Sequence, residues 1–451
     1  MTVPLGPADP TSDAPGPTVW SDRGFWGRAG QASVTLWLGH AATLASSIVV
    51  ARAFAVSEFG AIVLAAATVT IISGFLDLTL DEAVVYHGVR ADEGGRKGEM
   101  RGLLRAATRF DLVNGLVVCG LTLLTAGPIA RAVGGRAIDP DLIRIASLLP
   151  LMGTVDGTTG AALVVAGKAH VRAAMIGLSG VVRLALVVMV VGSGSQAAVL
   201  LCYVAGAAIA ALVQGVIAWR EVWRPLRHEA AVGGMRAWTG PLVRFGMHTS
   251  ITTTIGSAGA AVVPIVLART AGVAEAGLVT VAMLPITAVL VGSTPLRMVL
   301  FPEQARMSAT GNDRMLRRVL NQYVVASLAI GLIGAVVAFI VLPWLLPQLY
   351  SSRYEAAVWP ARILLLGAVA RLVTVWSKNF PAAIGRPRLR TQVAAFELVL
   401  LIALIAVFGR QGAPGAAWAI SVAYLVTGVV WWVLSRTMTS SGSASAAGQP
   451  G

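Results

Sequence analysis

The sequence predicts an all-α integral membrane protein with about twelve transmembrane helices, arranged as two six-helix lobes around a central cleft. Three observations support this prediction: long apolar stretches, an uneven distribution of basic residues between them, and an internal repeat. Of the 451 residues, 56% are hydrophobic and only 12% are charged, whereas soluble proteins are about one quarter charged. The mean hydropathy of +0.76 leaves too few polar residues to cover a water-exposed surface.

The apolar stretches define the predicted helices. A helix that crosses a bilayer needs about 20 predominantly apolar residues, and a membrane β-barrel would instead show alternating segments of ~10 residues. The predicted helices are 31–52, 58–87, 104–130, 141–166, 173–192, 197–219, 241–268, 277–301, 317–346, 357–384, 391–409 and 414–435. The second helix could end early, near Asp77, and the ninth could break at Pro343 or Pro347.

These helices divide the chain into five segments. Residues 1–30, with several prolines, are a predicted disordered cytoplasmic tail. The first six helices form an amino-terminal lobe over 31–219, and the last six form a carboxy-terminal lobe over 241–436. A basic cytoplasmic linker over 220–240 joins the lobes, and the Ser-, Ala- and Gly-rich residues 437–451 are a second predicted disordered tail.

The basic residues indicate the orientation in the membrane. If the amino terminus is cytoplasmic, the segments predicted inside carry far more Lys and Arg than those predicted outside, as the positive-inside rule requires. This distribution predicts an even number of spans, both termini in the cytoplasm, and a multi-pass location in the plasma (inner) membrane. The net charge of +14 is explained by these loops, and no basic and aromatic surface module predicts nucleic-acid binding.

A ten-residue segment occurs twice. Ala51–Gly60 and Ala268–Gly277 share Ala, Arg, Val, Glu and Gly in register, at an offset of 217 (268 minus 51). Later in the chain the offset is 218 (362 minus 144), and the matched pairs are Arg144 with Arg362, Gly167 with Gly385, Lys168 with Arg386, Arg172 with Arg390, and Gly194 with Gly412. Because each copy contains six spans, the repeats are parallel and related by an axis along the membrane normal. A working cleft is expected between them.

Ionisable groups inside the membrane are unfavourable unless they face protein or water, so they are the candidate site residues. In the tenth helix Arg371, Thr374 and Lys378 share one face. Two cations there would suit an anionic substrate such as a phosphate. The alternative is that both snorkel to the interface, which is harder for Arg371 because it lies in the middle of the helix.

The seventh predicted helix is the most polar span, which favours a position lining the cleft. Within it, His248 and Thr252 are four residues apart on one face. In the first helix, His40 and Thr43 begin a polar stripe that either faces the cleft or makes helix–helix hydrogen bonds. Arg297 lies at the inner end of the eighth helix and completes the candidate substrate-binding residues.

Three acidic residues are candidates for ion coupling. Asp77 and Asp81 are four residues apart in the second predicted helix, and inside the membrane they would form a proton- or cation-binding pair. Alternatively, the helix ends near Asp77 and both acids lie at the cytoplasmic interface. Asp156 lies in the middle of the fourth helix. Arg183 and Glu397 are further charges, in the fifth and eleventh helices.

The sequence shows no catalytic constellation, so we expect a protein that is not an enzyme and uses no cofactor. It has no Walker A loop for ATP hydrolysis and no cluster of His, Cys and carboxylate residues with the spacing of metal ligands. The two cysteines, Cys119 and Cys202, lie in apolar stretches. They fit neither a disulfide framework nor a metal site.

Five short motifs occur in an order typical of one family. They are Val56-Ser57-Glu58-Phe59-Gly60, Leu242-Val243-Arg244-Phe245-Gly246, Phe301-Pro302-Glu303-Gln304-Ala305-Arg306, Arg353-Tyr354-Glu355-Ala356-Ala357 and Gly412-Ala413-Pro414-Gly415-Ala416. With them, the chain resembles the polysaccharide or lipid-linked oligosaccharide flippases of the multidrug/oligosaccharidyl-lipid/polysaccharide (MOP) exporter superfamily, over about residues 31–436. It departs from that pattern at Leu278, where many members have Tyr, and over 259–264, which contain no acidic residue.

The resemblance implies a MATE-like fold and movement of an undecaprenyl-diphosphate-linked glycan from the inner to the outer leaflet by alternating access. It implies that the cleft cations, led by Arg371 with Lys378 and His248, hold the diphosphate. The implied partners are the lipid-linked glycan, membrane lipids, and glycan polymerase or export machinery. One alternative is a MATE-type, ion-coupled exporter of drugs or metabolites. A second is a non-transporting component of cell-surface glycan assembly.

Overall fold

The computed structural model describes residues 23–76, 80–135, 138–232, 235–293, 313–378, 380–383 and 388–446. Every regular element in these residues is helical. Ten of the described helices are long and apolar enough to cross a membrane. Two shorter helices that meet at a bend of 41° make an eleventh span when they are taken together. The prediction of an all-α, multi-pass membrane protein is confirmed.

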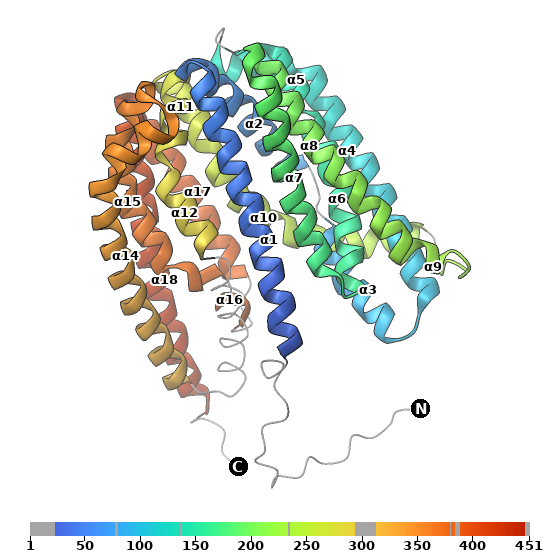
Figure 1. The fold of residues 1–451 in the computed structure, drawn as a ribbon. Helices are drawn as coiled ribbons and strands as arrows, with labels where there is room; N and C mark the ends of the chain where they lie inside the picture. The colour runs from blue at the N-terminus through green and yellow to red at the C-terminus, as the bar shows by residue number, and fades with distance from the viewer. Residues whose placement is uncertain are drawn as a thin grey trace.

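The amino-terminal lobe contains the first six candidate spans, and Figure 1 shows its helices in blue to green. Its elements are α1 (Arg23–Ala53), α2 (Val56–Leu76), α3 (Asp81–Glu93), α4 (Lys97–Gly134), α5 (Pro140–Ala146), α6 (Leu148–Val165), α7 (Ala169–Val190), the turn η2 (Val191–Ser193) and α8 (Gln196–Ala218). α5 and α6 together make one span. α1 packs along α7, and α8 packs against both α6 and α7.

A π-helical turn, η3 (Trp219–Trp223), and the short α9 (Arg224–Leu226) lead out of this lobe. The carboxy-terminal lobe then consists of α10 (Met235–Thr270), α11 (Val273–Ala282), α12 (Leu284–Gly292), α14 (Asp313–Tyr350), η4 (Ser352–Ala357), α15 (Val358–Val373), η5 (Val375–Lys378), α16 (Phe380–Ala383), α17 (Arg388–Phe408), η6 (Gly409–Gln411) and α18 (Ala413–Ala446). α11 and α12 form the bent span.

Four predicted helices are divided in the described structure. The predicted helix 141–166 is α5 and α6, 277–301 is bent between α11 and α12, and the other two are 58–87 and 357–384. The second predicted helix, 58–87, is two elements, because α2 ends at Leu76 and α3 begins at Asp81. The carboxylates of Asp81 and Glu82 stand in the first turn of α3, where the helix dipole favours negative charge. The tenth predicted helix, 357–384, is interrupted after α15, and η5 and α16 follow.

Helices also extend into both predicted tails. α1 begins at Arg23, and α18 continues to Ala446. Neither extension contains a proline, so the backbone can keep its helical hydrogen bonds beyond the apolar span. The ninth helix does not break where its prolines stand, since α14 continues through Pro343 and Pro347.

The repeat extends to the boundaries of the helices. α1 and α10 end at Ala53 and Thr270, and α2 and α11 begin at Val56 and Val273, so both pairs keep the first offset found in the sequence. The turns η2 and η6 keep the second offset at both of their ends. Gly194 and Gly412 follow these turns with φ of 68° and 74°, a backbone conformation that glycine adopts without steric cost. The two lobes are therefore built to one plan.

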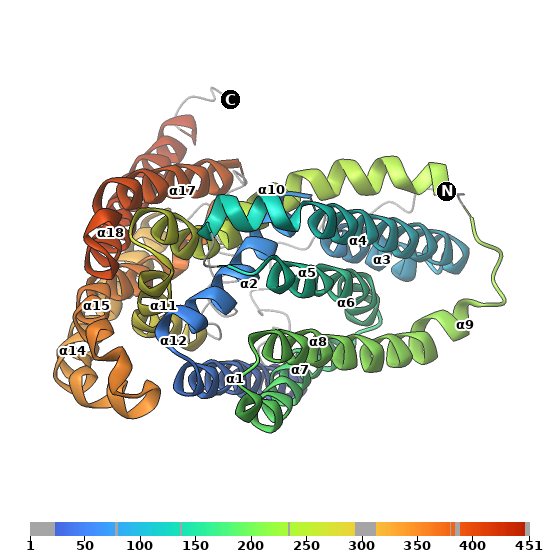
Figure 2. The ribbon, with the colours of Figure 1, turned by 90° about the horizontal axis from the view of Figure 1, so that it is seen from above.

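The two copies of the repeated segment lie against each other where α2 meets α11. A Cβ atom added to Gly277 would come within 2.7 Å of the Val56 carbonyl oxygen, and one added to Gly60 would overlap the Val273 carbonyl oxygen. The same positions therefore meet in both directions, as expected around a two-fold axis. This contact lies at the end of the molecule opposite the start of α1 and the end of α18 (Figure 1), with one lobe on each side of it (Figure 2).

α10 packs against both lobes. Near its start, Trp238 and Leu242 join a buried cluster with Leu80 and Leu103 of the amino-terminal lobe. The Trp238 ring also contacts the ring of His87, with 6.0 Å between their centres. Farther along, α10 packs on α17 of its own lobe and on α2. This helix therefore links the two lobes along its length.

Candidate functional site

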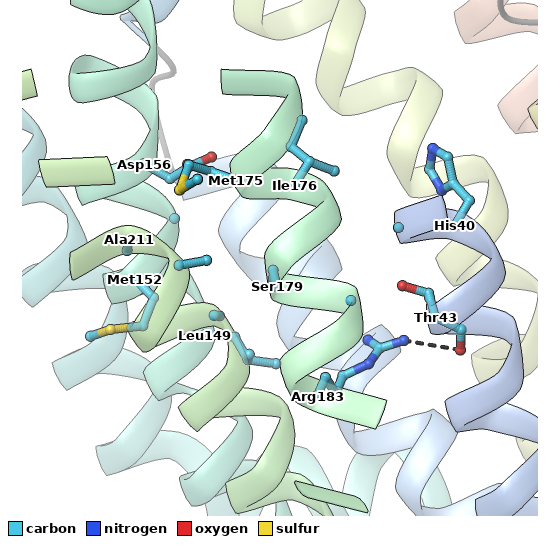
Figure 3. A pocket seen from close by; sticks show the side chains of 15 residues that line it. His40, Thr43, Leu149, Met152, Asp156, Met175, Ile176, Ser179, Arg183 and Ala211 are labelled. Atoms are coloured by element: carbon cyan, nitrogen blue, oxygen red, sulfur yellow. Dashed lines mark hydrogen bonds between the residues drawn. The ribbon is translucent and has the colours of Figure 1, made fainter. Parts of the chain in front are cut away.

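A cavity of ≈ 380 Å³ lies inside the amino-terminal lobe, between α1, α6, α7 and α8 (Figure 3). We call it the N-lobe cavity. Its polar lining comes from His40 and Thr43 of α1, Asp156 of α6, and Ser179 and Arg183 of α7. Sites for small molecules typically have volumes of about 300–1,000 Å³ with a few polar groups among apolar ones. The cavity is therefore large enough for a ligand group.

Small residues set α1 directly against α7. A Cβ atom added to Gly39 would lie 2.7 Å from the Cα of Gly177, and one added to Gly180 would lie 2.5 Å from the Gly39 carbonyl oxygen. Such positions let the backbones of two membrane helices touch. As a result Arg183, one turn farther along α7, reaches α1, and its Nη2 donates to the Thr43 carbonyl oxygen at 3.1 Å (Figure 3).

The positive charge of Arg183 has no carboxylate partner in the described part of the chain. No Asp or Glu oxygen there lies within 4.0 Å of its guanidinium. Its Cζ lies 4.5 Å from the centre of the Tyr203 ring. Its Nε is buried and has no hydrogen-bond partner among the described residues. Because Arg183 lies well inside the span Ala169–Ser193, this charge is costly without a counter-charge.

Asp156, predicted from the sequence to be mid-membrane, also lines the N-lobe cavity. Figure 3 shows it well separated from Arg183. The Asp156 carbonyl oxygen accepts a hydrogen bond from Gln214 Nε2 at 2.9 Å, and the same amide donates to Thr159 Oγ1 at 2.8 Å. These bonds link α8 to α6 beside Asp156, and the role of its carboxylate in ion coupling stays a prediction.

His40 lines two spaces at once. Besides the N-lobe cavity, it borders an interlobe groove of ≈ 330 Å³ between α1 and α12, which is lined by Trp37, His40, Ala41, Leu44, Leu284, Thr287, Ala288, Val291 and Gly292. Most of these side chains are apolar. Because α1 belongs to one lobe and α12 to the other, the groove lies between the lobes. A polar cavity and an apolar groove therefore meet at His40.

Arg371 lies in the other lobe, with two partners. Its guanidinium forms an ion pair with Glu397 of α17, and its Cζ lies 3.8 Å from the centre of the Tyr424 ring of α18. This cation therefore already has a counter-charge, and a substrate anion would have to compete with Glu397. That Arg371 binds substrate stays a prediction.

The remaining predicted site residues are not brought together by the described structure. Asp81 begins α3, outside the candidate spans, and its carboxylate is paired with Arg172 at 3.0 Å. This position agrees with the interfacial alternative. Asp77 and Arg297 lie outside the described residues, as do the side chains of His248 and Thr252 on α10 and of Lys378 in η5.

The sequence marked Arg183 as an intramembrane charge but did not distinguish it from the other intramembrane charges. Arg183 is a cation in the middle of a predicted span, as Arg371 is. Only packing shows that one of them has a carboxylate partner and the other borders a cavity. Among the described residues, no group of three or more His, Cys, Asp or Glu could hold a metal ion.

The arrangement of helices matches solved structures. One described as the inward-facing conformation of a multidrug resistance MATE family transporter of the MOP superfamily has a TM-score of 0.74 at 14% identity, covering 90% of this chain and 96% of that chain. The lipid II flippase MurJ, in an inward closed conformation, has a TM-score of 0.70 at 14% identity, covering 90% and 87%. The Vibrio cholerae MATE transporter VcmN, in the bent form, has a TM-score of 0.61 at 15% identity, covering 92% and 98%. No curated protein matches the chain in sequence.

The fold therefore defines a multi-pass membrane protein built like the transporters of the MOP superfamily. A family model described as polysaccharide biosynthesis protein matches residues 49–359, which is more than half of the chain. The chain belongs to this polysaccharide biosynthesis protein family. The MATE-like fold that the sequence resemblance implied is confirmed.

Proposed function

We propose that the protein moves a polyprenyl-diphosphate-linked oligosaccharide from the cytoplasmic to the outer leaflet by alternating access. Its family supports polysaccharide synthesis as the process, and the likeness to a lipid II flippase supports a lipid-linked cargo. The observation that carries the proposal is the junction at His40 between the polar N-lobe cavity and the apolar interlobe groove. A cargo with a charged head and a long apolar tail needs two such surroundings side by side.

The proposed orientation has both termini in the cytoplasm, because most Lys and Arg of the connecting segments would then lie inside. The reciprocal contact of Gly60 with Gly277 would then close the outer end. The TM-score of 0.74 with a structure described as inward-facing supports an inward-facing state. Transport would require the α2–α11 contact to open while the inner ends of the lobes approach.

The cleft cations inferred from the sequence remain part of the proposal. Arg371 would bind a phosphate oxygen only by exchanging it for the carboxylate of Glu397, since the two side chains are paired. Lys378, His248 and Arg297 would act with it from the same lobe, and Thr252 would donate a hydrogen bond. Glycan polymerase or export machinery would receive the product.

A second candidate is a MATE-type, ion-coupled exporter. Asp156 favours it, because a membrane-embedded carboxylate that lines a cavity is the group such coupling requires. The two candidates differ in what they ask of this residue. An exporter needs the Asp156 carboxylate for efflux, whereas the diphosphate of a glycolipid needs cations.

A deletion strain tests the proposed function. We expect it to lose surface polysaccharide and to accumulate the lipid-linked precursor on the cytoplasmic side, and the wild-type gene to reverse both effects. In the complemented strain, Asp156→Asn separates the candidates, since loss of drug resistance with normal polysaccharide would favour the exporter. Normal surface polysaccharide without precursor accumulation in the deletion strain would contradict the flippase proposal.

A further inference from the structure

The repeat allows the interior of one lobe to be compared with that of the other, position by position. At the offset of 218, Arg371, Glu397 and Tyr424 of the carboxy-terminal lobe fall on Gly153, Ser179 and Gly206. The matching turns η2 and η6 confirm this offset between the last two of these positions. The three side chains that cluster inside one lobe are thus replaced by two glycines and a serine in the other.

These replacements leave open space in the amino-terminal lobe at positions that carry large side chains in the other lobe. Gly153 and Ser179 line the N-lobe cavity, and a Cβ atom added to Gly153 would meet nothing within 4 Å. Gly206 packs on Arg183, because a Cβ atom there would lie 3.0 Å from the Arg183 Cβ. The N-lobe cavity is therefore open at the positions equivalent to Arg371 and Glu397, whose side chains are paired in the other lobe.

The charges differ in the same way. In the carboxy-terminal lobe, the cation Arg371 is balanced by Glu397. In the amino-terminal lobe, the cation Arg183 stands four residues after Ser179 on α7, so both lie on one face of that helix. Ser179 occupies the position equivalent to Glu397 and carries no charge. The amino-terminal lobe thus has a half-buried cation, Arg183, and no carboxylate at the position equivalent to Glu397. The carboxylate in the cavity lining, Asp156, lies well apart from Arg183 (Figure 3).

We propose that the N-lobe cavity is a binding site for a phosphate-type anion. The anion of the ligand would pair with Arg183, as the Glu397 carboxylate pairs with Arg371 in the other lobe. The inference rests on the proposed function and refines it, because it assigns the diphosphate to the amino-terminal lobe in this state of the protein, in which Arg371 of the other lobe is already paired with Glu397. The planar guanidinium matches phosphate oxygens in pairs. The Thr43 hydroxyl and the His40 ring are further donors in the lining, and the interlobe groove receives the apolar tail.

The equivalent position supplies the test. Ser179→Glu installs the missing carboxylate four residues from Arg183, where it should pair with the guanidinium and exclude the ligand. Ser179→Gln adds the same bulk without the charge. Binding is measured with the purified full-length protein in nanodiscs, with three probes: polyprenyl diphosphate, inorganic pyrophosphate and the neutral polyprenol. We expect Ser179→Glu and Arg183→Gln to weaken diphosphate binding by about tenfold or more, and Ser179→Gln to weaken it much less.

Filling the cavity gives a second test that does not change charge. Gly153→Leu is expected to weaken diphosphate binding, because its side chain would occupy the open space. Gly120→Leu is the matched control, since Gly120 lies on α4, does not line the cavity, and has nothing within 4 Å of its added Cβ. Size-exclusion profiles of all variants exclude misfolding as the cause.

The outcomes separate this inference from the proposed function. Binding of pyrophosphate as well as polyprenyl diphosphate identifies the anion itself as the ligand group, and binding of polyprenyl diphosphate alone identifies a lipid headgroup. Undiminished diphosphate binding by Ser179→Glu would overturn the proposed anion-binding site, and so would a loss with Ser179→Gln as large as that with Ser179→Glu. The site would also be overturned if the variants weakened binding of the neutral polyprenol as much as binding of the diphosphate. If the deletion strain shows no polysaccharide defect while these binding effects are observed, the flippase proposal is contradicted and the proposed anion-binding site is supported.

Discussion

Gly60 and Gly277 occupy equivalent positions in the two repeats, and each lies against the backbone of the other lobe. A methyl group on Gly60 would overlap the Val273 carbonyl oxygen, and a backbone atom cannot move aside as a flexible side chain can. We therefore expect Gly60→Ala to lower the free energy of unfolding by about 1–3 kcal/mol, measured as thermal or denaturant unfolding in detergent. Gly215→Ala is the control, because its added Cβ meets nothing within 4 Å; equal losses in both variants would contradict the close contact.

At the same scale, the sequence predicts which residues need partners and does not identify those partners. The mid-span position of Arg371 correctly required a polar environment, yet Glu397 lies 26 residues away on another helix, and Tyr424 lies on a third. Arg183 has the same sequence signature as Arg371 and a different environment. The difference lies at Gly153, Ser179 and Gly206, whose small size has no meaning until the helices are packed.

Among the helices, α14 shows how a proline is accommodated inside a membrane span. Pro343 has no N–H, so the carbonyl of Phe339, four residues earlier, loses its helical donor. Nε of Arg362 on α15 donates to this carbonyl at 3.0 Å, and its guanidinium stacks on the Phe339 ring with 4.1 Å between Cζ and the ring centre. No water is present in the hydrocarbon region to replace this donor.

Arg362→Ala is therefore expected to destabilise the protein by about 1–3 kcal/mol, the usual effect of leaving an acceptor unsatisfied away from water. Pro343→Ala restores the missing N–H, so in that background the loss caused by Arg362→Ala should be smaller. A double-mutant cycle of unfolding free energies measures this coupling. Additive effects would show that Arg362 does not serve the Phe339 carbonyl.

The packing of α3 on α10 is predicted to depend on pH. His87 of α3 lies outside the candidate spans and contacts Trp238 of α10. Burial, and then the charge of Arg90, lower the pKa of His87 below its usual value of 6.5. The folded state thus favours the neutral ring, so its stabilisation is complete above the unfolded pKa and declines as the pH falls below it.

We expect wild-type protein to lose more thermal stability between about pH 7.5 and about pH 5.5 than the variant His87→Gln, whose side chain cannot gain a proton. The two pH values lie about one unit above and below the ordinary histidine pKa of ~6.5. Melting temperatures of both proteins at the two pH values provide the measurement. Parallel declines would assign the acid sensitivity to other groups.

The presence of a helix could be predicted from the length of each apolar stretch, whereas the residues at which helices begin and end were harder to predict. The predicted helix 58–87 contains two elements because its acids begin a new helix rather than continue the span. The break considered in the ninth helix is absent because Arg362, which is distant in sequence, supplies the hydrogen bond that Pro343 removes. Local composition cannot reveal a donor that comes from another helix.

For the whole molecule, alternating access requires the reciprocal contact between the repeated segments to open. Ser57 and Ala274 are equivalent, exposed positions on the two copies. Spin labels on Ser57→Cys and Ala274→Cys, with the buried Cys119 and Cys202 replaced by alanine, report their separation in liposomes. We expect a second, longer distance to appear when lipid-linked glycan is added. A single unchanged distance in protein that still transports would contradict opening at this contact.

The global plan of the molecule was the most predictable level. The two offsets that matched residues in the sequence also match helix ends in the structure, because a duplicated sequence folds into duplicated elements. The sequence did not show that the repeated segments touch each other, nor that the equivalent interiors differ, since both depend on how the lobes pack.

The self-complementary contact between the repeats has the geometry of a symmetric homodimer contained in one chain. In a true homodimer every substitution appears twice, so a residue that fills one subunit fills the other, and a cavity is either present in both or absent from both. Covalent duplication removes that constraint. Each half can change alone, so a position can carry a large side chain in one lobe while the equivalent position in the other lobe borders a cavity that can bind a ligand.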